Sequence, residues 1–365
     1  MPPFPPEIAE KVLDDFVTST MRKIAKKEPR DLVTPRNPLF KRLESREVGG
    51  IVEENPGQPV VRDLQYAVAD RDIELSRTQR VQTRNYTPEE SFTSAQFEYG
   101  MCLSTLTVDM YTYENVQTPE ALVNYMERAK RVKDRSHRNK QVGYLWDGRT
   151  IGTTPIFGLK DAIRFTPTSD PARGAIGRVS VSDLPQWTNK SANYNDNFLA
   201  YDSGAEIETF LDNGSNSLLS LYFKCSERAR GEGPEGQPDL IACNEAYFRC
   251  CHRMVSKGLM FRDNKDRYKL GVDGFVFQNA VIFEDPNVPD DPNNSTYGVA
   301  MLLNSRSFDV VYTKGIRNRW GNTVTLQGDT AIAIDKVTQM TVAYDDLGEL
   351  GIHYGVIPTV DAGGS

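Results

Sequence analysis

Residues 118–145 read TPEALVNYMERAKRVKDRSHRNKQVGYL, and this stretch predicts one long helix. Thr118 is a favourable N-cap, and Pro119 suits the first helical position, where a backbone N–H has no partner inside the helix. Apolar side chains then recur at helical spacing, at Leu122, Tyr125, Met126, Ala129 and Val132. At 1.5 Å per residue the helix would be about 40 Å long. Its second half, KDRSHRNKQ, is polar all round, which is typical of a helix that crosses open surface or contacts another subunit.

The segments that precede this helix carry little apolar surface of their own. Residues 7–28 have the stripe of an amphipathic helix, and residues 34–57 are rich in proline, glycine and charge. Residues 60–100 contain two strand-like stretches, YAVADRDIEL and TQRVQTRNYT, with charges on both faces. A two-stranded ribbon of this kind is not stable alone. We therefore expect an extended arm followed by a projecting ribbon, both of which need a partner surface.

Strand signals dominate the remaining sequence. Residues 101–114 alternate between apolar and polar side chains, which predicts a half-buried strand with apolar side chains at Met101, Leu103, Leu106, Val108 and Met110. Ser203 opens a helical stretch that reaches Cys225 and is interrupted at Asn213-Gly214. Residues 240–243 form a short buried strand, and Asn244 caps the helix that follows. Further strands are expected at 275–283, at 299–303 and from residue 307 onward. The pattern predicts a mixed α+β chain.

Composition narrows the class of protein. The chain has 365 residues, of which 39% are hydrophobic, and a formal net charge of -7, which argues against a dedicated nucleic-acid binder. No apolar run is long enough to predict a transmembrane helix, and the start lacks a signal pattern, so we expect folding in a cytoplasm. The five cysteines form no C-x-x-C pair, which predicts free buried thiols.

The sequence offers little for catalysis or metal binding. Its three histidines, His137, His252 and His353, accompany no phosphate-binding loop, H-E-x-x-H motif or G-x-S-x-G motif, so we expect neither an enzyme nor a cofactor. The cluster of Cys243, Cys250, Cys251 and His252 has the wrong spacing for zinc. A second set of acids, Asp285, Asp290 and Asp291, lacks the ligand spacing of a calcium loop. No metal site is therefore predicted.

Beyond the long helix, a series of short sequence strings follows in a specific order along the chain. They are Trp146-Asp147-Gly148, residues 157–163 (FGLKDAI), the stretch from Pro171 to Gly177, Trp187-Thr188-Asn189, residues 238–244 (PDLIACN) with Tyr247, residues 283–286 (FEDP) and Leu302-Leu303-Asn304. In this order the chain resembles the major capsid proteins of tailed bacteriophages, whose fold is shared with herpesvirus capsid floors and encapsulins. One departure is the aspartate-rich loop 284–294, which is longer than the family leads us to expect.

The resemblance implies an α+β capsid fold with five parts. These are an N-terminal arm (1–59), an extended-loop ribbon (60–100), a peripheral domain with a long spine helix (101–150), an axial domain (151–305) and a return to the peripheral domain (306–365). The implied function is self-assembly into pentamers and hexamers that close an icosahedral shell around double-stranded DNA. Such a protein would be located in the virion after assembly in the host cytoplasm, without contact with a membrane. Its implied partners are further copies of itself, a scaffold protein, the portal and a decoration protein.

Two other readings stay open at this point. An encapsulin-like shell would share the fold but enclose a protein cargo. A DNA-binding protein that uses the basic helix 128–140 would be small in solution, and its DNA affinity would depend steeply on salt.

The extended loop supplies the candidate subunit interface, formed by Arg71, Arg77, Arg80, Arg84, Glu89 and Glu90. Arginine forks there would pair with carboxylates on a neighbouring subunit, and the alternative is a solvated charged hairpin. No lysine occurs between Lys41 and Lys130. Some relatives cross-link their subunits through a lysine–asparagine isopeptide bond from this loop. Since the loop has no lysine here, we expect a non-covalent shell.

The spine helix supplies the candidate DNA-facing surface, formed by Arg128, Arg131, Lys133, Arg135 and Arg138, with Lys130 and Lys140 nearby. These cations would contact packaged DNA through phosphate charge alone. The alternatives are pairing with the arm or with a scaffold protein, and a solvated helix face.

Overall fold

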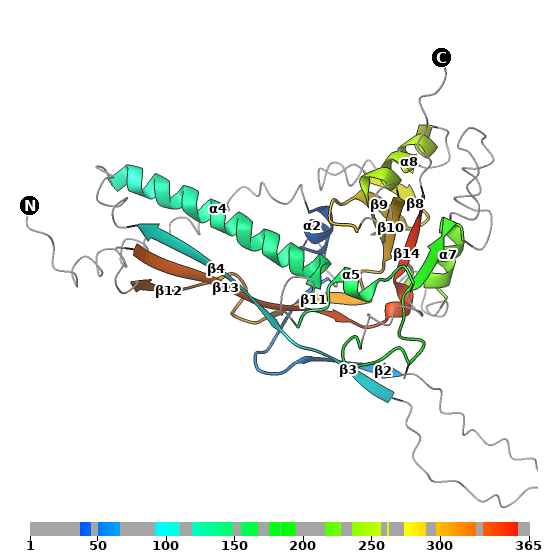
Figure 1. The fold of residues 1–365 in the computed structure, drawn as a ribbon, viewed down its shortest axis with the longest axis horizontal. Helices are drawn as coiled ribbons and strands as arrows, with labels where there is room; N and C mark the ends of the chain where they lie inside the picture. The colour runs from blue at the N-terminus through cyan, green and yellow to red at the C-terminus, as the bar shows by residue number, and fades with distance from the viewer. Residues whose placement is uncertain are drawn as a thin grey trace, which may run out of the picture.

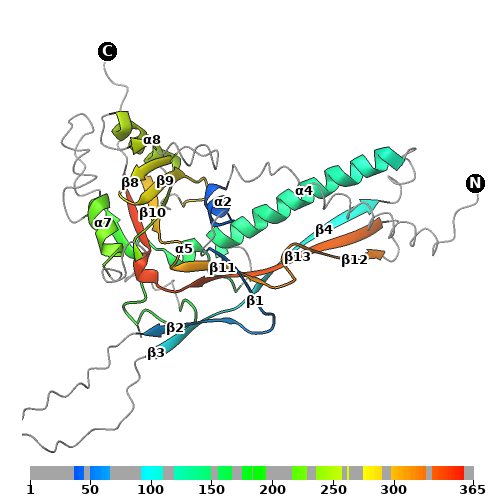
Figure 2. The same ribbon diagram turned by 180° about the vertical axis from the view of Figure 1, so that it is seen from behind.

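Two β-sheets and one long helix determine the shape of the molecule. The computed structural model describes residues 37–44, 50–65, 92–109, 119–148, 155–166, 175–182, 184–194, 216–227, 236–256, 261–262, 274–289, 297–325 and 331–356. A long helix over one sheet forms an elongated wing, and the second sheet with its helices lies at the other end (Figures 1 and 2). The α+β class predicted from the sequence is confirmed.

The wing consists of helix α4 (Pro119–Trp146) on a five-stranded sheet. The sheet order is β1 (Ile51–Glu54), β11 (Phe308–Thr313), β13 (Ala331–Tyr344) and β12 (Arg319–Thr325), while β4 (Gly100–Asp109) also pairs with β13. The 14 residues of β13 are enough to pair with β4 and β12 in the first part of the strand and with β11 near its end. The predicted helix is confirmed to within one residue at each end.

The second sheet has seven strands in the order β5, β14, β10, β6, β9, β8 and β7. Their bounds are Lys190–Asn193 for β5, Gly351–Val356 for β14, Tyr297–Leu303 for β10, Leu240–Cys243 for β6, Ala280–Glu284 for β9, Gly274–Phe277 for β8 and Phe261–Arg262 for β7. Strand β14 pairs with β10 and β5. The range 306–365, expected to return to the peripheral domain, therefore also contributes a strand to this second sheet.

Both faces of the second sheet are buried. Ile241 and Cys243 of β6 face a cluster that includes α7 (Leu218–Cys225) and α8 (Glu245–Ser256), whereas Leu240 and Ala242 face a cluster that includes the base of α4. Burial on both faces explains why β6 is an uninterrupted apolar run. Asn244 accepts a hydrogen bond from the backbone N–H of Tyr247 in α8, as the sequence predicted. Helix α7 is capped by Ser217, whereas Ser203, the predicted start of this helical stretch, lies outside the described residues.

The structure describes the part of the ribbon that lies nearest the body of the chain. Strands β2 (Val60–Gln65) and β3 (Phe92–Phe97) pair in antiparallel register, and residues 66–91 lie outside the described ranges. Phe97 is fully buried and makes edge-to-face contacts with the rings of Phe157 and Tyr344. Arg62 lies 2.9 Å from Asp309 and 3.0 Å from Asp345, so its charge anchors the ribbon within its own chain.

Three short helices complete the described elements: α2 (Pro38–Glu44), α5 (Leu159–Ala162) and the 3₁₀ helix η6 (Leu347–Glu349). All five cysteines are buried and none forms a disulfide, as predicted. Across the segments that the structure describes, no helix is both long and apolar enough to span a bilayer.

One strand face was predicted wrongly. The side chains of Met101 and Leu103 in β4 are 62% and 45% exposed, whereas Cys102, Ser104 and Leu106 point inward. The alternation was read correctly as a strand, and Leu106 of the predicted apolar set is buried. Met101 and Leu103 were misassigned because the surface under α4 is partly polar. A sequence pattern that assumes an apolar core cannot detect such a face.

Candidate functional site at the base of the long helix

Helix α4 ends where two glycines bring their backbones into contact. Trp146 is fully buried, and Gly148 follows it with φ of +49°. A Cβ at Gly148 would lie 2.1 Å from the backbone nitrogen of Gly158, and a Cβ at Gly158 would lie 2.6 Å from the carbonyl oxygen of Trp146. Asp161 of α5 accepts a hydrogen bond from the Gly158 N–H at 3.1 Å. This crossing fixes α4 relative to α5.

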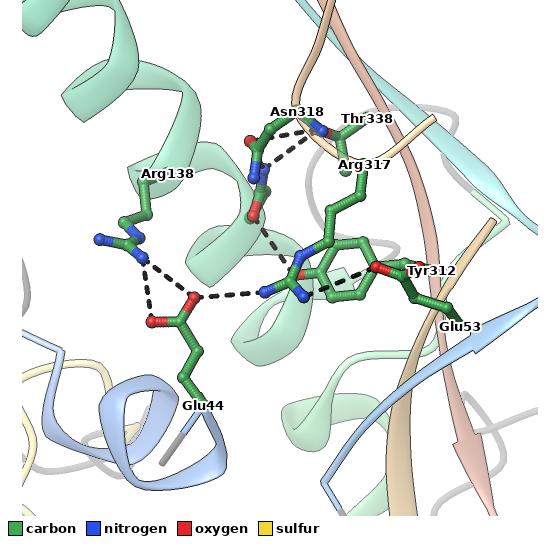
Figure 3. Close-up of polar contacts among 8 residues, drawn as sticks. Glu44, Glu53, Arg138, Tyr312, Arg317, Asn318 and Thr338 are labelled. Carbon is green, nitrogen blue, oxygen red and sulfur yellow. Dashed lines mark hydrogen bonds and ion pairs between the residues drawn. The ribbon is translucent and has the colours of Figure 1, made fainter. Parts of the chain in front are cut away.

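A cluster of ion pairs surrounds the last turns of α4 (Figure 3). Nη2 of Arg138 lies 2.9 Å from both carboxylate oxygens of Glu44 in α2. Arg317, in the turn between β11 and β12, approaches the same carboxylate at 3.4 Å and Glu53 of β1 at 3.8 Å. Its guanidinium lies over the ring of Tyr312 at 4.7 Å. Three segments that are distant in the sequence thus meet at Glu44.

A buried polar layer separates α4 from the sheet. Gln141 accepts a hydrogen bond from Tyr312 through Oε1 and donates through Nε2 to Asn318 and Thr338. Thr338 Oγ1 also accepts from the backbone N–H of Asn318 at 3.0 Å. Both lone pairs of that hydroxyl are then used, so its O–H donates to Nε2 of His137 at 2.7 Å.

This assignment determines the tautomer of His137. Because Nε2 accepts, Nδ1 carries the proton and donates to Ser104 Oγ at 2.9 Å. The side chain is fully buried, and burial lowers the pKa of His137 to about 4, with a smaller contribution from Lys336. A second proton on Nε2 would face a hydroxyl that has no free lone pair. The layer is therefore complete only while His137 is neutral.

Toward the N-terminal end of α4, charged side chains instead of hydroxyl groups make the contacts between the helix and the sheet. Lys336 of β13 lies 2.6 Å from Asp134, and its ammonium group lies over the ring of Trp320 at 5.5 Å. Lys130 approaches the same ring at 5.6 Å and is only 8% exposed. One side of α4 therefore binds the sheet through polar and cation–π contacts.

The predicted DNA-facing residues fall into separate groups. Arg131 and Arg135 are exposed on the outer side of α4, and Lys133 is half-buried. Arg138 instead turns toward α2, where it pairs with Glu44 and lies 6.0 Å from the centre of the Phe40 ring. The side chain of Arg128 lies outside the described residues, so the structure does not test its role.

The predicted interface residues, Arg71, Arg77, Arg80, Arg84, Glu89 and Glu90, all fall within 66–91 and so outside the described ranges. Of the acids considered for calcium, Asp285 is fully buried and binds backbone and amide N–H groups, while Asp290 and Asp291 also lie outside these ranges. Within the described ranges, no three His, Cys, Asp or Glu side chains gather closely enough to hold a metal ion.

Sequence reasoning missed Glu44, Arg317 and His137 as members of one site. No local signal links them, because they lie on three separate segments.

Several solved structures share the overall fold of this chain over most of its length. The holo-SrpI encapsulin complex from Synechococcus elongatus PCC 7942 aligns with a TM-score of 0.52 at 8% identity, covering 89% of this chain and 90% of that chain. The capsid protein of cyanophage A-1(L) aligns with a TM-score of 0.52 at 13% identity, covering 82% and 88%. This chain has the fold of phage capsid proteins and encapsulins. The capsid protein of an empty GTA particle aligns with a TM-score of 0.50 at 8% identity, covering 91% and 92%.

The capsid fold explains why the sequence strings recur in order. Trp146-Asp147-Gly148 and Phe157-Gly158 form the glycine crossing below the spine helix α4, and residues 238–244 form β6 with the cap of α8. No protein-family model matches the sequence, and no curated protein matches it.

Proposed function

We propose that this chain is the major capsid protein of a tailed bacteriophage, and that its copies form pentamers and hexamers that close an icosahedral shell around double-stranded DNA. The observation that supports this best is the capsid fold, which solved phage capsids and encapsulins share over 82% to 91% of the chain. The proposal assigns no reaction to the chain. A scaffold protein, the portal and a decoration protein would be its partners in the virion.

The proposed division of labour follows the two sheets. The second sheet, with α7 and α8, would form the axial domain, and the wing would form the peripheral domain. Residues 1–59 would act as the arm, although α2 and β1 within that range pack into the body of the chain. Residues 60–100 would contact a neighbouring subunit beyond the ribbon base.

Expression of the full chain, alone and with its neighbouring genes, tests the proposal. Negative-stain images should show closed shells, and nuclease-treated particles made with the neighbouring genes should retain double-stranded DNA. A chain that stays monomeric under all conditions would remove the proposal.

An encapsulin-like shell is the second candidate, because the encapsulin aligns as well as the cyanophage capsid protein. The contents of the particle separate the two. Shells that contain one co-purifying protein and no nuclease-resistant DNA would favour the encapsulin.

We expect the shell to be non-covalent. An isopeptide bond needs a lysine amine as its nucleophile, and the sequence has no lysine between Lys41 and Lys130. Mature particles boiled in SDS should therefore run as a single monomer band. A ladder of multimers would contradict this expectation.

We expect reversal of the outer charges on α4 to lower the DNA content of particles. Arg131→Glu with Arg135→Glu changes two exposed cations to anions, which would repel phosphates. DNA per particle, measured by absorbance ratio, should fall while empty shells still form. Arg178→Glu with Arg249→Glu makes the same charge change at two exposed arginines away from α4 and serves as the control. If the α4 variant fails to form even empty shells, this face is a subunit contact instead.

A further inference from the structure

Helix α2 lies between the two sheets (Figure 1), and its apolar side chains belong to a buried cluster that includes residues of both. It has seven residues, and Leu39, Phe40 and Leu43 are almost completely buried in the cluster that joins the sheets. A helix this short is not stable alone in water, so its structure depends on these contacts. Residues 1–36 precede it directly in the sequence.

The N-terminal end of α2 is held by the second sheet. Asp285, just after β9, accepts a hydrogen bond from the backbone N–H of Leu39 at 3.3 Å. Its other oxygen accepts from the backbone N–H and the side-chain amide of Asn287, at 2.9 and 2.8 Å. That amide also donates to Asn37 at 3.1 Å. A residue 246 positions away in the sequence thus caps the first turn of α2.

The C-terminal end of α2 is held by the wing. Glu44 receives Arg138 of the spine helix and Arg317 of the β11–β12 turn (Figure 3). The Arg138 guanidinium also lies over the Phe40 ring, 6.0 Å from its centroid, so the same arginine contacts α2 by an ion pair and by a cation–π contact. One end of this short helix is therefore bound at the end of β9 in the second sheet, and the other end is bound to the spine helix and the β11–β12 turn of the wing.

The contacts that hold the two ends of α2 are weak enough to break. The donors that hold Asp285 are neutral N–H groups, and burial of a carboxylate without a cation at contact distance is costly. Burial accordingly raises the pKa of Asp285 to about 6. The Glu44 pairs are partly exposed to solvent, where such pairs contribute about 0–1 kcal/mol each.

We propose that α2 is a releasable clasp that holds the axial sheet and the spine helix in one relative position, and that its undocking frees them to move against each other. This inference concerns a single chain and does not depend on shell assembly.

Trypsin tests the clasp, because Lys41 and Arg42 lie inside α2 and their peptide bonds become cleavable only when the helix leaves its site. Cleavage of the unassembled full chain is followed by mass spectrometry of fragments that begin at Arg42 or Leu43. Glu44→Gln removes the wing anchor. Asp285→Asn removes the other, since an amide cannot accept on both sides. Each variant should raise the cleavage rate roughly tenfold. Asp285→Asn leaves one buried group unsatisfied, whereas Glu44→Gln loses two partly exposed ion pairs that contribute about 0–1 kcal/mol each.

Two controls separate clasp opening from general instability. Glu53→Gln removes a carboxylate from the same cluster without touching α2, and it should change the rate less than about twofold. Cleavage after Lys336, which is 7% exposed in β13, reports global opening and should keep its wild-type rate.

The double variant decides whether the two ends act together. If α2 undocks as one unit, the two effects multiply, to about a hundredfold. Hydrogen exchange should then also quicken in β9 and in residues 138–146. Wild-type cleavage rates in both single variants would overturn the proposal. So would a double variant that loosens α2 alone, because α2 would then hold nothing together.

Discussion

Gly148→Ala is expected to lower the free energy of unfolding by more than about 4 kcal/mol, which is at the extreme of single substitutions. The added Cβ would lie 2.1 Å from the Gly158 nitrogen and 2.5 Å from a carboxylate oxygen of Asp161. The nearest obstacle is backbone, so relief requires α4 and α5 to separate. Separation would draw Trp146 and Leu159, both fully buried, out of the core.

Urea unfolding of the unassembled chain measures this effect, and Gly315→Ala supplies a matched control. Gly315 also has positive φ, at +79°, but a Cβ there meets nothing within 4 Å. Gly315→Ala should therefore lower the free energy of unfolding only by the cost of a left-handed backbone conformation, about 1 kcal/mol. Equal losses in the two variants would show that the glycine crossing is not tight.

The second large effect is a loss of stability in acid that originates at His137. The pKa of its buried imidazole is lowered from 6.5 to about 4, so the folded chain resists protonation more than the unfolded chain does. The resulting stability is fully present above pH 6.5 and is lost as the pH falls toward 4. A shift of this size corresponds to about 3 kcal/mol.

The charges around His137 favour the same direction. Lys336 of β13 and Lys140 of α4 oppose a further positive charge, while Asp134 partly offsets them. Lys130 of α4 lies over the same Trp320 ring as Lys336, 5.6 Å from its centroid. The Cys102 thiol of β4 is 3.6 Å from Nδ1 of His137. Protonation would also break the bond in which Thr338 donates to Nε2.

His137→Gln tests this assignment, since an amide can donate to Ser104 and accept from Thr338 without titrating. The difference in unfolding free energy between pH 7 and pH 4.5 should shrink by roughly 2–3 kcal/mol in this variant. A smaller acid dependence should remain, because burial also lowers the pKa of His353 to about 4. An unchanged pH profile would contradict the role of His137.

Asp285 affects the pH dependence of stability in the direction opposite to that of the two histidines. Its raised pKa, about 6, gives stability that is present below pH 4 and is lost as the pH rises through 6. The acid dependence of Asp285→Asn should therefore be steeper than that of the wild type. The sign of this change distinguishes the carboxylate from the two histidines.

Local signals determined part of this protein. The spine helix followed from Thr118, Pro119 and the apolar spacing after them, because helix start signals and periodicity act within a few residues. Strand β6 and the Asn244 cap followed for the same reason. The order of short strings indicated the capsid fold, since those strings mark tight backbone positions such as Gly148 and Gly158.

Only the tertiary structure decided what those elements bind. Met101 is exposed because the opposite face of β4 carries Ser104, which hydrogen-bonds to His137 beneath α4, as Thr338 also does. The tertiary structure also carried β14 into the second sheet. Asp285 and Glu44 became the two anchors of α2 through contacts across as many as 246 positions. Hydrogen bonds and ion pairs of this kind depend on which distant segments the fold places together, and residue order alone does not encode that placement in any local pattern.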